Sequence, residues 1–146
     1  MQQPDEFYMR QALREAEKAF ESGEVPVGAV LVIGERIIAR AHNQVELLKD
    51  PTAHAEVLAI TAACDFMGAK YLPEATLFVT LEPCLMCSGA LYWSKVGRIV
   101  FGARDPKNGY SCQVSGSPFH PKAKLETGVL ENEALALIQA FFQNRR

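Results

Sequence analysis

Two short segments of the chain carry side chains that bind transition metals. His54 and Glu56 flank an alanine in the first segment, and Cys84 and Cys87 belong to the second, Pro-Cys-Leu-Met-Cys. Each segment alone is weak evidence, because Cys-x-x-Cys also occurs in redox proteins and His-x-Glu can begin an ordinary polar helix. Together they supply one nitrogen and two sulfur donors, which zinc prefers. The combination predicts one Zn²⁺ per chain, with His54, Cys84 and Cys87 as its ligands.

Three ligands rather than four indicate a catalytic zinc. A structural zinc fills its shell with four protein groups, whereas a catalytic zinc leaves one position open for water. Glu56 lies two residues after His54, and side chains in a first helical turn lean toward the helix start, so both can reach a water there. We therefore expect Glu56 to be the catalytic proton carrier and not a ligand. The alternative is a structural zinc completed by Cys64, Cys112 or another histidine, although Cys64 is expected in the core and Cys112 in a loop.

The composition is that of one globular domain. The chain has 146 residues, of which 49% are hydrophobic and 22% charged, and this excludes the disordered and collagen-like classes. We expect a single domain over residues 1–146. No apolar run approaches the 18 residues of a membrane span, and the acidic start does not resemble a signal peptide. A cytoplasmic location is therefore expected, where four cysteines serve as metal ligands or free thiols rather than disulfides.

Charge is distributed unevenly along the chain. The net charge is -2 and the pI about 5.9, so the strongly basic signature of a nucleic-acid-binding domain is absent. Residues 95–124 nevertheless contain six Lys or Arg and one Asp. Such a segment is either a set of solvated loops or a surface that contacts phosphates.

The first elements read as a helix and a hairpin. Residues 6–22 are predicted as an amphipathic helix with Asp5 as its N-cap and Gly23 as its end. Residues 25–33 and 36–42 are rich in β-forming residues. The two residues between them begin with Gly34, which suits a type II′ turn and an antiparallel pair. The apolar residues at helical spacing in the first helix are Met9, Leu13, Ala16 and Phe20.

The two metal-binding segments are expected to open two further helices. The first is predicted over residues 52–68, with Asp50 as cap and Pro51 in its first position. The second, over residues 83–95, connects strands at 76–81 and 98–102, and a crossover of this length requires the strands to be parallel. The sheet is therefore mixed and the class is α/β. Open α/β sheets place their sites at the carboxyl ends of strands, where both helices begin.

The last third of the chain contains a long loop and a closing helix. Residues 106–122 read as loop with room for one short helix, and residues 124–129 as an edge strand. Residues 131–143 are predicted as a helix whose apolar positions include Leu135, Ile138 and Phe142.

The pattern His-x-Glu followed by Pro-Cys-x-x-Cys is typical of zinc-dependent nucleobase deaminases. Over nearly its whole length the chain resembles the bacterial tRNA-specific adenosine deaminases. The resemblance implies a three-layer α/β/α cytidine-deaminase-like fold with a central mixed five-stranded sheet, a homodimer, and conversion of adenosine to inosine at the wobble position of a tRNA anticodon. The matching segments are residues 26–30, Asn43, residues 50–56, 80–87 and 101–107, and the terminal Phe141, Phe142, Arg145 and Arg146.

The resemblance also implies contacts with the substrate. It predicts that Asn43 hydrogen-bonds the base, that Ala55 and Glu82 offer backbone groups, and that Val27 lines the pocket. The resemblance also implies that Asp105 and Lys107 bind the substrate. If the substrate is RNA, phosphate contacts are expected from several basic residues. These are Lys107, Lys122, Lys124, Arg145 and Arg146.

One segment departs from the family and keeps two alternatives open. Residues 108–122 lack the small-residue stretch and the later Asn-His pair that usually follow in this family. Because loops of this kind hold nucleotides at a pocket mouth, the departure bears on the substrate more than on the deamination. The alternatives are a deaminase of free guanine, cytosine or adenosine, and a non-catalytic zinc-binding module. Glu56 beside an open ligand position favours an enzyme over the module.

Overall fold

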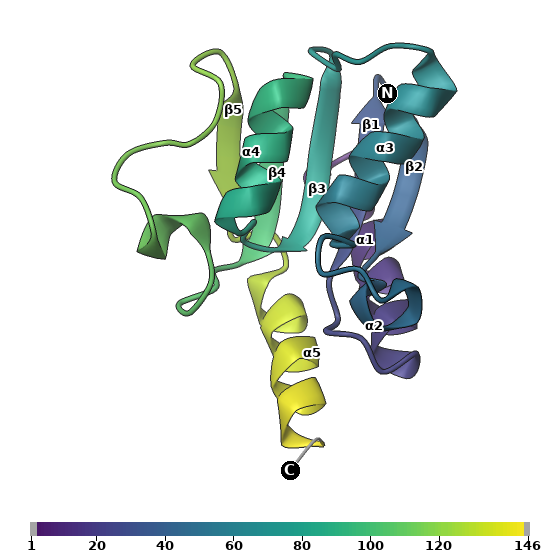
Figure 1. Ribbon diagram of the computed structural model, residues 1–146, viewed down its shortest axis with the longest axis vertical. Coiled ribbons are helices and arrows are strands. Elements are labelled where there is room, and N and C mark those ends of the chain that lie inside the picture. Colours follow the sequence, from purple (N-terminus) through teal and green to yellow (C-terminus); the bar gives the residue numbers. More distant parts are fainter. Residues whose placement is uncertain (1–2, 145–146) are drawn as a thin grey trace.

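A computed structural model describes residues 3–144, which form a five-stranded sheet between two layers of helices (Figure 1). The strand order is β2-β1-β3-β4-β5. The strands are β1 (Gly28–Ile33), β2 (Arg36–His42), β3 (Ala75–Leu81), β4 (Arg98–Ala103) and β5 (Lys124–Thr127). The helices are α1 (Asp5–Glu21), α2 (Val45–Leu48), α3 (Ala55–Met67), α4 (Leu85–Ser94) and α5 (Glu131–Gln143), with a 3-10 turn η1 at Tyr110–Cys112.

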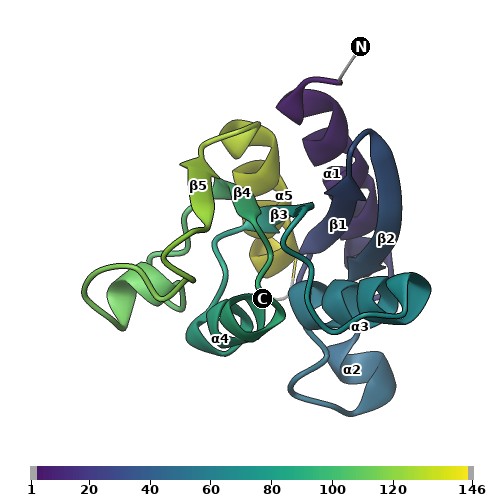
Figure 2. The ribbon, with the colours of Figure 1, turned by 90° about the horizontal axis from the view of Figure 1, so that it is seen from above.

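The predicted fold class is confirmed, and Figure 2 shows the three layers from above. Helices α3 and α4 cover one face of the sheet, and α1 and α5 cover the other. Strand β1 is antiparallel to β2 and β3, whereas β3, β4 and β5 are parallel. The carboxyl ends of β2, β3 and β4 therefore lie together along one border of the sheet, the lower border in Figure 1. We call this border, which is formed by strand ends and not by an edge strand, the site edge.

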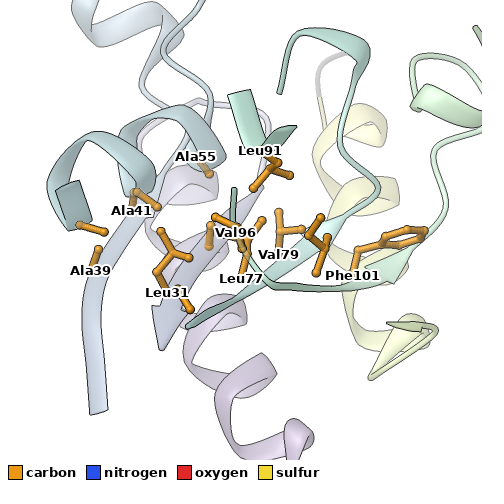
Figure 3. Packing of buried hydrophobic residues seen from close by; sticks show 14 of the residues in the cluster. Leu31, Ala39, Ala41, Ala55, Leu77, Val79, Leu91, Val96 and Phe101 are labelled. Atoms are coloured by element: carbon orange, nitrogen blue, oxygen red, sulfur yellow. The ribbon is translucent and has the colours of Figure 1, made fainter. Parts of the chain in front are cut away.

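The central strands are buried on both faces. Between the sheet and the α3–α4 layer, Leu31, Leu77 and Phe101 pack with Ala55 of α3 and Leu91 of α4 (Figure 3). Successive strand residues point to opposite faces, so a second cluster forms beneath α1. That cluster contains Tyr8, Met9, Ala12, Val30, Val32, Phe78 and Val100. Burial on two faces explains why these strands read as continuous apolar runs.

The predicted antiparallel hairpin is confirmed. Gly34 has a φ of 63°, a left-handed value that glycine adopts without steric cost. The expected N-cap of α1 is wrong, because Pro4 is in the capping position and Asp5 lies in the first turn. The carboxylate of Asp5 instead accepts two hydrogen bonds from the guanidinium of Arg98 in β4, at 2.9 and 2.6 Å. This pair ties the start of α1 to the sheet.

The second predicted helix begins three residues later than expected. Asp50 and Pro51 do not cap α3, because the Asp50 carboxylate accepts hydrogen bonds from the N–H and hydroxyl of Thr52 in a separate turn. His54 has an extended backbone and precedes the first helical residue, Ala55. The N–H of Ala55 donates to the side chain of Asn43. A tertiary hydrogen bond, and no local signal, therefore fixes the start of this helix.

Near the C-terminus the strand and the helix differ in detail from the expectation. Strand β5 is at the edge as predicted but ends at Thr127, before Gly128 turns the chain with a φ of 86°. Helix α5 has the predicted bounds, and it buries Ala134 and Phe141 rather than the neighbouring Leu135 and Phe142, which are exposed. The loop after β4 contains the predicted short helix, η1.

Candidate active site

The two predicted metal-binding segments meet at the site edge. His54 immediately precedes α3 and Cys84 immediately precedes α4, and both have extended backbones. Their side chains therefore lie at helix N-termini, where the dipole and free N–H groups stabilise a thiolate. Both segments were predicted to lie at the starts of helices that follow strands in the sequence. The topology of the sheet brings these two helix starts together.

His54, Cys84 and Cys87 form one compact group. The His54 Nδ1 atom lies 3.6 Å from the Cys84 sulfur and 3.5 Å from the Cys87 sulfur. The three ligand atoms all lie within 4.8 Å of one another. Cys87 is fully buried, and the other two are partly exposed. One nitrogen and two sulfurs at this spacing fit a zinc ion, and their individual roles as ligands stay a prediction.

The pKa values of the two thiols in this group are shifted in opposite directions. Their mutual hydrogen bond lowers the pKa of Cys84 to about 4, helped by a hydrogen bond from His54. The same interaction, together with burial, raises the pKa of Cys87. Two thiolates in contact repel each other, so only one ionises readily. A divalent cation between them removes that repulsion, and its binding would release the second proton.

No fourth cysteine or histidine completes the group within residues 3–144. Cys64 is partly buried against the core on α3, and its burial raises the pKa of its thiol. Cys112 is exposed, and its sulfur lies 3.2 Å from the carbonyl oxygen of Pro106. The part of the chain that the structure describes thus offers no four-ligand structural zinc site. The three-ligand arrangement leaves a position for water.

Glu56 lies beside the metal-binding group. It is the second residue of α3, is 4% exposed, and lines the same pocket as His54 and Cys84. Burial raises the pKa of Glu56 to about 7, and the negative charge of Cys84 adds to this rise, while His54 opposes it. A carboxyl of this acidity can accept and return a proton near neutral pH.

These groups open into a pocket of about 380 Å³ at the site edge. Its wall includes the predicted Val27, Asn43, Glu82 and Asp105. Lys107 does not line it, although this exposed residue lies on the same turn as Asp105. The remaining lining residues were not predicted, and most of them come from elements distant in the sequence from the metal-binding segments. They are Gly23, Glu24, Val25, Val45, Glu46, Leu81, Asn108, Phe141 and Phe142.

Asn43 connects three segments at the pocket. Its Oδ1 accepts the N–H of Ala55 at 2.8 Å, and its own backbone N–H donates to the carbonyl of Val27 at 3.1 Å. The residue is 8% exposed and lines the pocket. Since the oxygen is occupied, the Asn43 amide has its NH₂ group to offer to a ligand. The Ala55 N–H is held by this bond, and the predicted contact of an Ala55 backbone group with the substrate stays a prediction.

Glu82 makes hydrogen bonds within the fold through both its backbone and its side chain, and its predicted contact with the substrate stays a prediction. Its backbone N–H donates to the carbonyl of Ala103 at 2.8 Å, so this N–H is not offered to a substrate. The buried carboxylate accepts the N–H groups of Asp105 and Ser111 at 3.0 and 2.9 Å. Asp105 in turn accepts two backbone N–H groups with its carboxylate, from Lys107 and the following residue. Glu82 therefore holds the loop that lines one side of the pocket.

The predicted phosphate-contacting residues are divided between two edges of the sheet. Lys124 pairs in register with Arg98 at the start of β4, so it lies at the edge opposite the site. Lys122 and Lys124 line a separate hollow there. Only Lys107 of the described lysines in that set lies on a pocket-lining turn. Arg145 and Arg146 lie outside the described residues.

The missed aromatic residues carried a weak signal in the sequence. Two adjacent phenylalanines close α5, and neighbouring residues of a helix point about 100° apart, so the two rings can have different surroundings. Phe141 is 5% exposed and packs edge-on with Phe20, at 6.1 Å between ring centroids. Phe142 is 52% exposed at the pocket. An exposed aromatic ring beside a pocket is a surface on which a base can stack.

The fold and this site define a zinc-dependent hydrolytic deaminase. Residues 2–103 match the family described as the cytidine and deoxycytidylate deaminase zinc-binding region. The chain belongs to this family. It is also 50% identical to a tRNA-specific adenosine deaminase of Bacillus subtilis, over 97% of this chain and 91% of that protein. The predicted resemblance to bacterial tRNA-specific adenosine deaminases is therefore confirmed.

Solved structures agree with this assignment. A structure from a study of A-to-I editing by tRNA:A34 deaminases has a TM-score of 0.84 and 41% identity, and the match covers 90% of this chain and 98% of that chain. A guanine deaminase from Bacillus subtilis has a TM-score of 0.68 and 34% identity, over 80% of this chain and 73% of that chain.

Within residues 3–144, no helix is long and apolar enough to cross a membrane.

Proposed function

We propose that this chain is a hydrolase that converts adenosine to inosine at the wobble position of a tRNA anticodon. One observation carries the proposal: a buried carboxyl, Glu56, lies beside the group of His54, Cys84 and Cys87 in an open pocket. The names of the similar deaminases support tRNA as the substrate. A cytoplasmic location belongs to the same proposal.

In this proposal His54, Cys84 and Cys87 hold a zinc ion. When bound, zinc supplies the Lewis acidity that allows water to react at neutral pH. Water adds to C6 of adenine, the ring carbon that carries the exocyclic amine. Glu56 takes a proton from this water, delivers it to the adjacent ring nitrogen, and assists the amine to leave. Adenosine and water thus give inosine and ammonia.

The remaining pocket residues orient the base. The NH₂ group of Asn43 is placed to donate a hydrogen bond to a ring acceptor, because its oxygen is held by α3. Val27 supplies an apolar wall. The exposed ring of Phe142 stacks on a base next to the target, since an anticodon loop presents unstacked bases at low cost.

We also propose that the protein is a homodimer formed through the α3–α4 layer. Helix α4 turns one side toward the sheet and leaves large apolar side chains on the other. Trp93 at 73% exposure is the largest of these, and a cluster of this kind marks an interaction surface. The other exposed large apolar residues of α4 are Leu85, Met86 and Tyr92, and the end of α3 adds Phe66 and Met67.

Ammonia release tests the proposed function. The zinc-loaded protein is given an anticodon stem-loop with adenosine at the wobble position, and in parallel free adenosine, guanine and cytosine. We expect the stem-loop to be deaminated far faster than the three small substrates, because only the stem-loop reaches the pocket rim and its charges. Efficient turnover of guanine or cytosine with an inert stem-loop would replace this proposal with a free-base deaminase.

A further inference from the structure

Two buried glutamates line the pocket but take no part in the proposed deamination chemistry. Glu24 and Glu82 are each 2% exposed and both line the pocket. Each carboxylate accepts two backbone N–H groups from one segment of the pocket wall. A buried carboxylate with two such partners fixes the position of the segment that supplies them.

Glu24 holds the wall made by α2. Its two carboxylate oxygens accept the N–H of Glu46 at 3.0 Å and of Leu47 at 2.9 Å. Gln44, the residue before this four-residue helix, makes no side-chain cap. Glu24, more than twenty residues away, therefore caps α2 in its place. Val45 and Glu46 of this helix line the pocket.

Glu82 holds the wall made by the turn after β4. It accepts the N–H of Asp105 at 3.0 Å and of Ser111 at 2.9 Å. The carboxylate lies so close to Gly109 that a Cβ on this glycine would be 2.4 Å from the Glu82 Cδ atom. The turn can approach the carboxylate only because residue 109 has no side chain. Asp105 and Asn108 of this turn line the pocket.

The two walls lie on opposite sides of the site edge, α2 at the lower right and the green segment after β4 at the lower left of Figure 1. Neither glutamate belongs to the metal-binding group. We infer that Glu24 and Glu82 are positioning residues, whose carboxylates hold the two walls of the pocket apart at the separation that admits the substrate nucleotide. The inference rests on the proposed function for the identity of that nucleotide, but not for the holding of the walls.

Glu82→Gln and Glu24→Gln test the inference with nearly unchanged side-chain volume. An amide keeps one acceptor oxygen but turns its NH₂ toward the second backbone N–H, so one hydrogen bond to a charged group is lost. In zinc-loaded protein we expect amide hydrogen exchange to accelerate by about tenfold to a hundredfold at Asp105 and Ser111 in the first variant. In the second variant the acceleration is expected at Glu46 and Leu47.

The kinetic readout separates positioning from chemistry. For the stem-loop we expect KM to rise about tenfold in each variant while kcat changes less than about threefold and zinc content stays at one per chain. Effects of the two variants should multiply, because the walls are separate. Glu74→Gln is the matched control, since Glu74 is exposed beside the hollow at the opposite edge and should change neither exchange nor KM.

The outcomes are distinguishable from those of the proposed function. Unchanged amide exchange in both variants would overturn the inference, as would accelerated exchange with an unchanged KM. Loss of zinc or of kcat alone would assign these glutamates to the metal site or to the chemistry instead. If wild type deaminates a free base and not the stem-loop, the proposed function fails, and the exchange data with KM for that base still decide the inference.

Discussion

At the residue scale, position rather than residue type separates the proposed metal ligands from the proposed proton carrier. His54 and Glu56 are two residues apart, yet one precedes α3 in extended backbone and the other lies inside its first turn. The histidine therefore faces the two sulfurs, and the glutamate is enclosed and 4% exposed. Burial gives Glu56 a pKa of about 7, which suits an exchange of protons near neutral pH.

The ligand assignment predicts the effect of removing one sulfur. Cys87→Ser should lower the zinc content well below one per chain and abolish most activity, because two remaining ligands bind zinc poorly. Elemental analysis of the purified protein measures this directly. Cys112→Ser is the matched control, since Cys112 is exposed and outside the group, and it should keep its zinc. Full zinc in Cys87→Ser would contradict the assignment.

The role of Glu56 predicts the opposite combination of results. Glu56→Gln should keep one zinc per chain and the same thermal unfolding, because the amide occupies nearly the same volume. The rate of deamination should fall by about 10² to 10⁴, the usual contribution of a general acid–base group. Ammonia release and zinc content are measured on the same sample. If the metal is lost together with the activity, Glu56 is a ligand and the structural-zinc alternative returns.

At the element scale, the sheet positions the site by bringing strand ends and helix starts to one edge. The mixed sheet, the crossover helix and the edge strand could all be predicted, because apolar runs, helical spacing and crossover length are local properties of the sequence. The exact starts of α3 and α4, the two helices at the site, could not be predicted, whereas the start of α5 could. Helix α3 begins at Ala55 because the side chain of Asn43 accepts a hydrogen bond from the Ala55 N–H. No sequence pattern near residue 52 predicts that hydrogen bond.

The same limit applies to the pocket wall. The residues of the metal-binding group could be predicted from their types and spacing in the sequence. The pocket-lining residues Glu24, Glu46 and Phe142 could not be predicted, because they come from separate segments that only the fold brings together. In α5 the helical period allows either Phe141 or Phe142 to face inward, and packing against Phe20 selects Phe141. Sequence reasoning therefore recovered the chemistry of the site better than its shape.

The contact between α1 and β1 yields a prediction for Gly28. A Cβ on this residue would lie 2.0 Å from the carbonyl oxygen of Ala12 and 2.4 Å from the amide nitrogen of Ala16. These are backbone atoms of a helix, so the whole of α1 must move. Gly28→Ala should lower the free energy of unfolding by about 3 kcal/mol or more. Urea unfolding measures it, and a change below about 1 kcal/mol would show that α1 can shift freely.

At the scale of the whole molecule, the two helical layers present different surfaces. The α3–α4 layer carries the apolar cluster around Trp93, and the other layer carries α1 and α5. If the cluster joins two copies, Trp93→Glu should convert the dimer into a monomer, because a buried unpaired charge disfavours the interface. Light scattering on the purified protein measures the mass. Leu135→Glu on exposed α5 is the control and should stay dimeric.

The distribution of charge over the two edges predicts how binding depends on salt. Lys107 is exposed on the turn beside Asp105 at the site edge, whereas Lys122 and Lys124 line the hollow at the opposite edge. Strand β4 has six residues and spans roughly 20 Å, at about 3.3 Å per residue, so the two sets are a strand length apart. Of these three lysines, only Lys107 lies at the end of the sheet where the pocket opens.

We expect Lys107→Ala to weaken binding of the anticodon stem-loop and to reduce the slope of log K against log salt by about 0.7 to 0.9, the value for one lost phosphate contact. The double variant Lys122→Ala and Lys124→Ala removes twice the charge from the opposite edge and serves as its control. If net charge alone attracted the RNA, the double variant would have the larger effect. If contact at the pocket rim matters, its salt slope should match that of wild type. A larger loss of slope in the double variant would move the RNA to the opposite edge of the sheet.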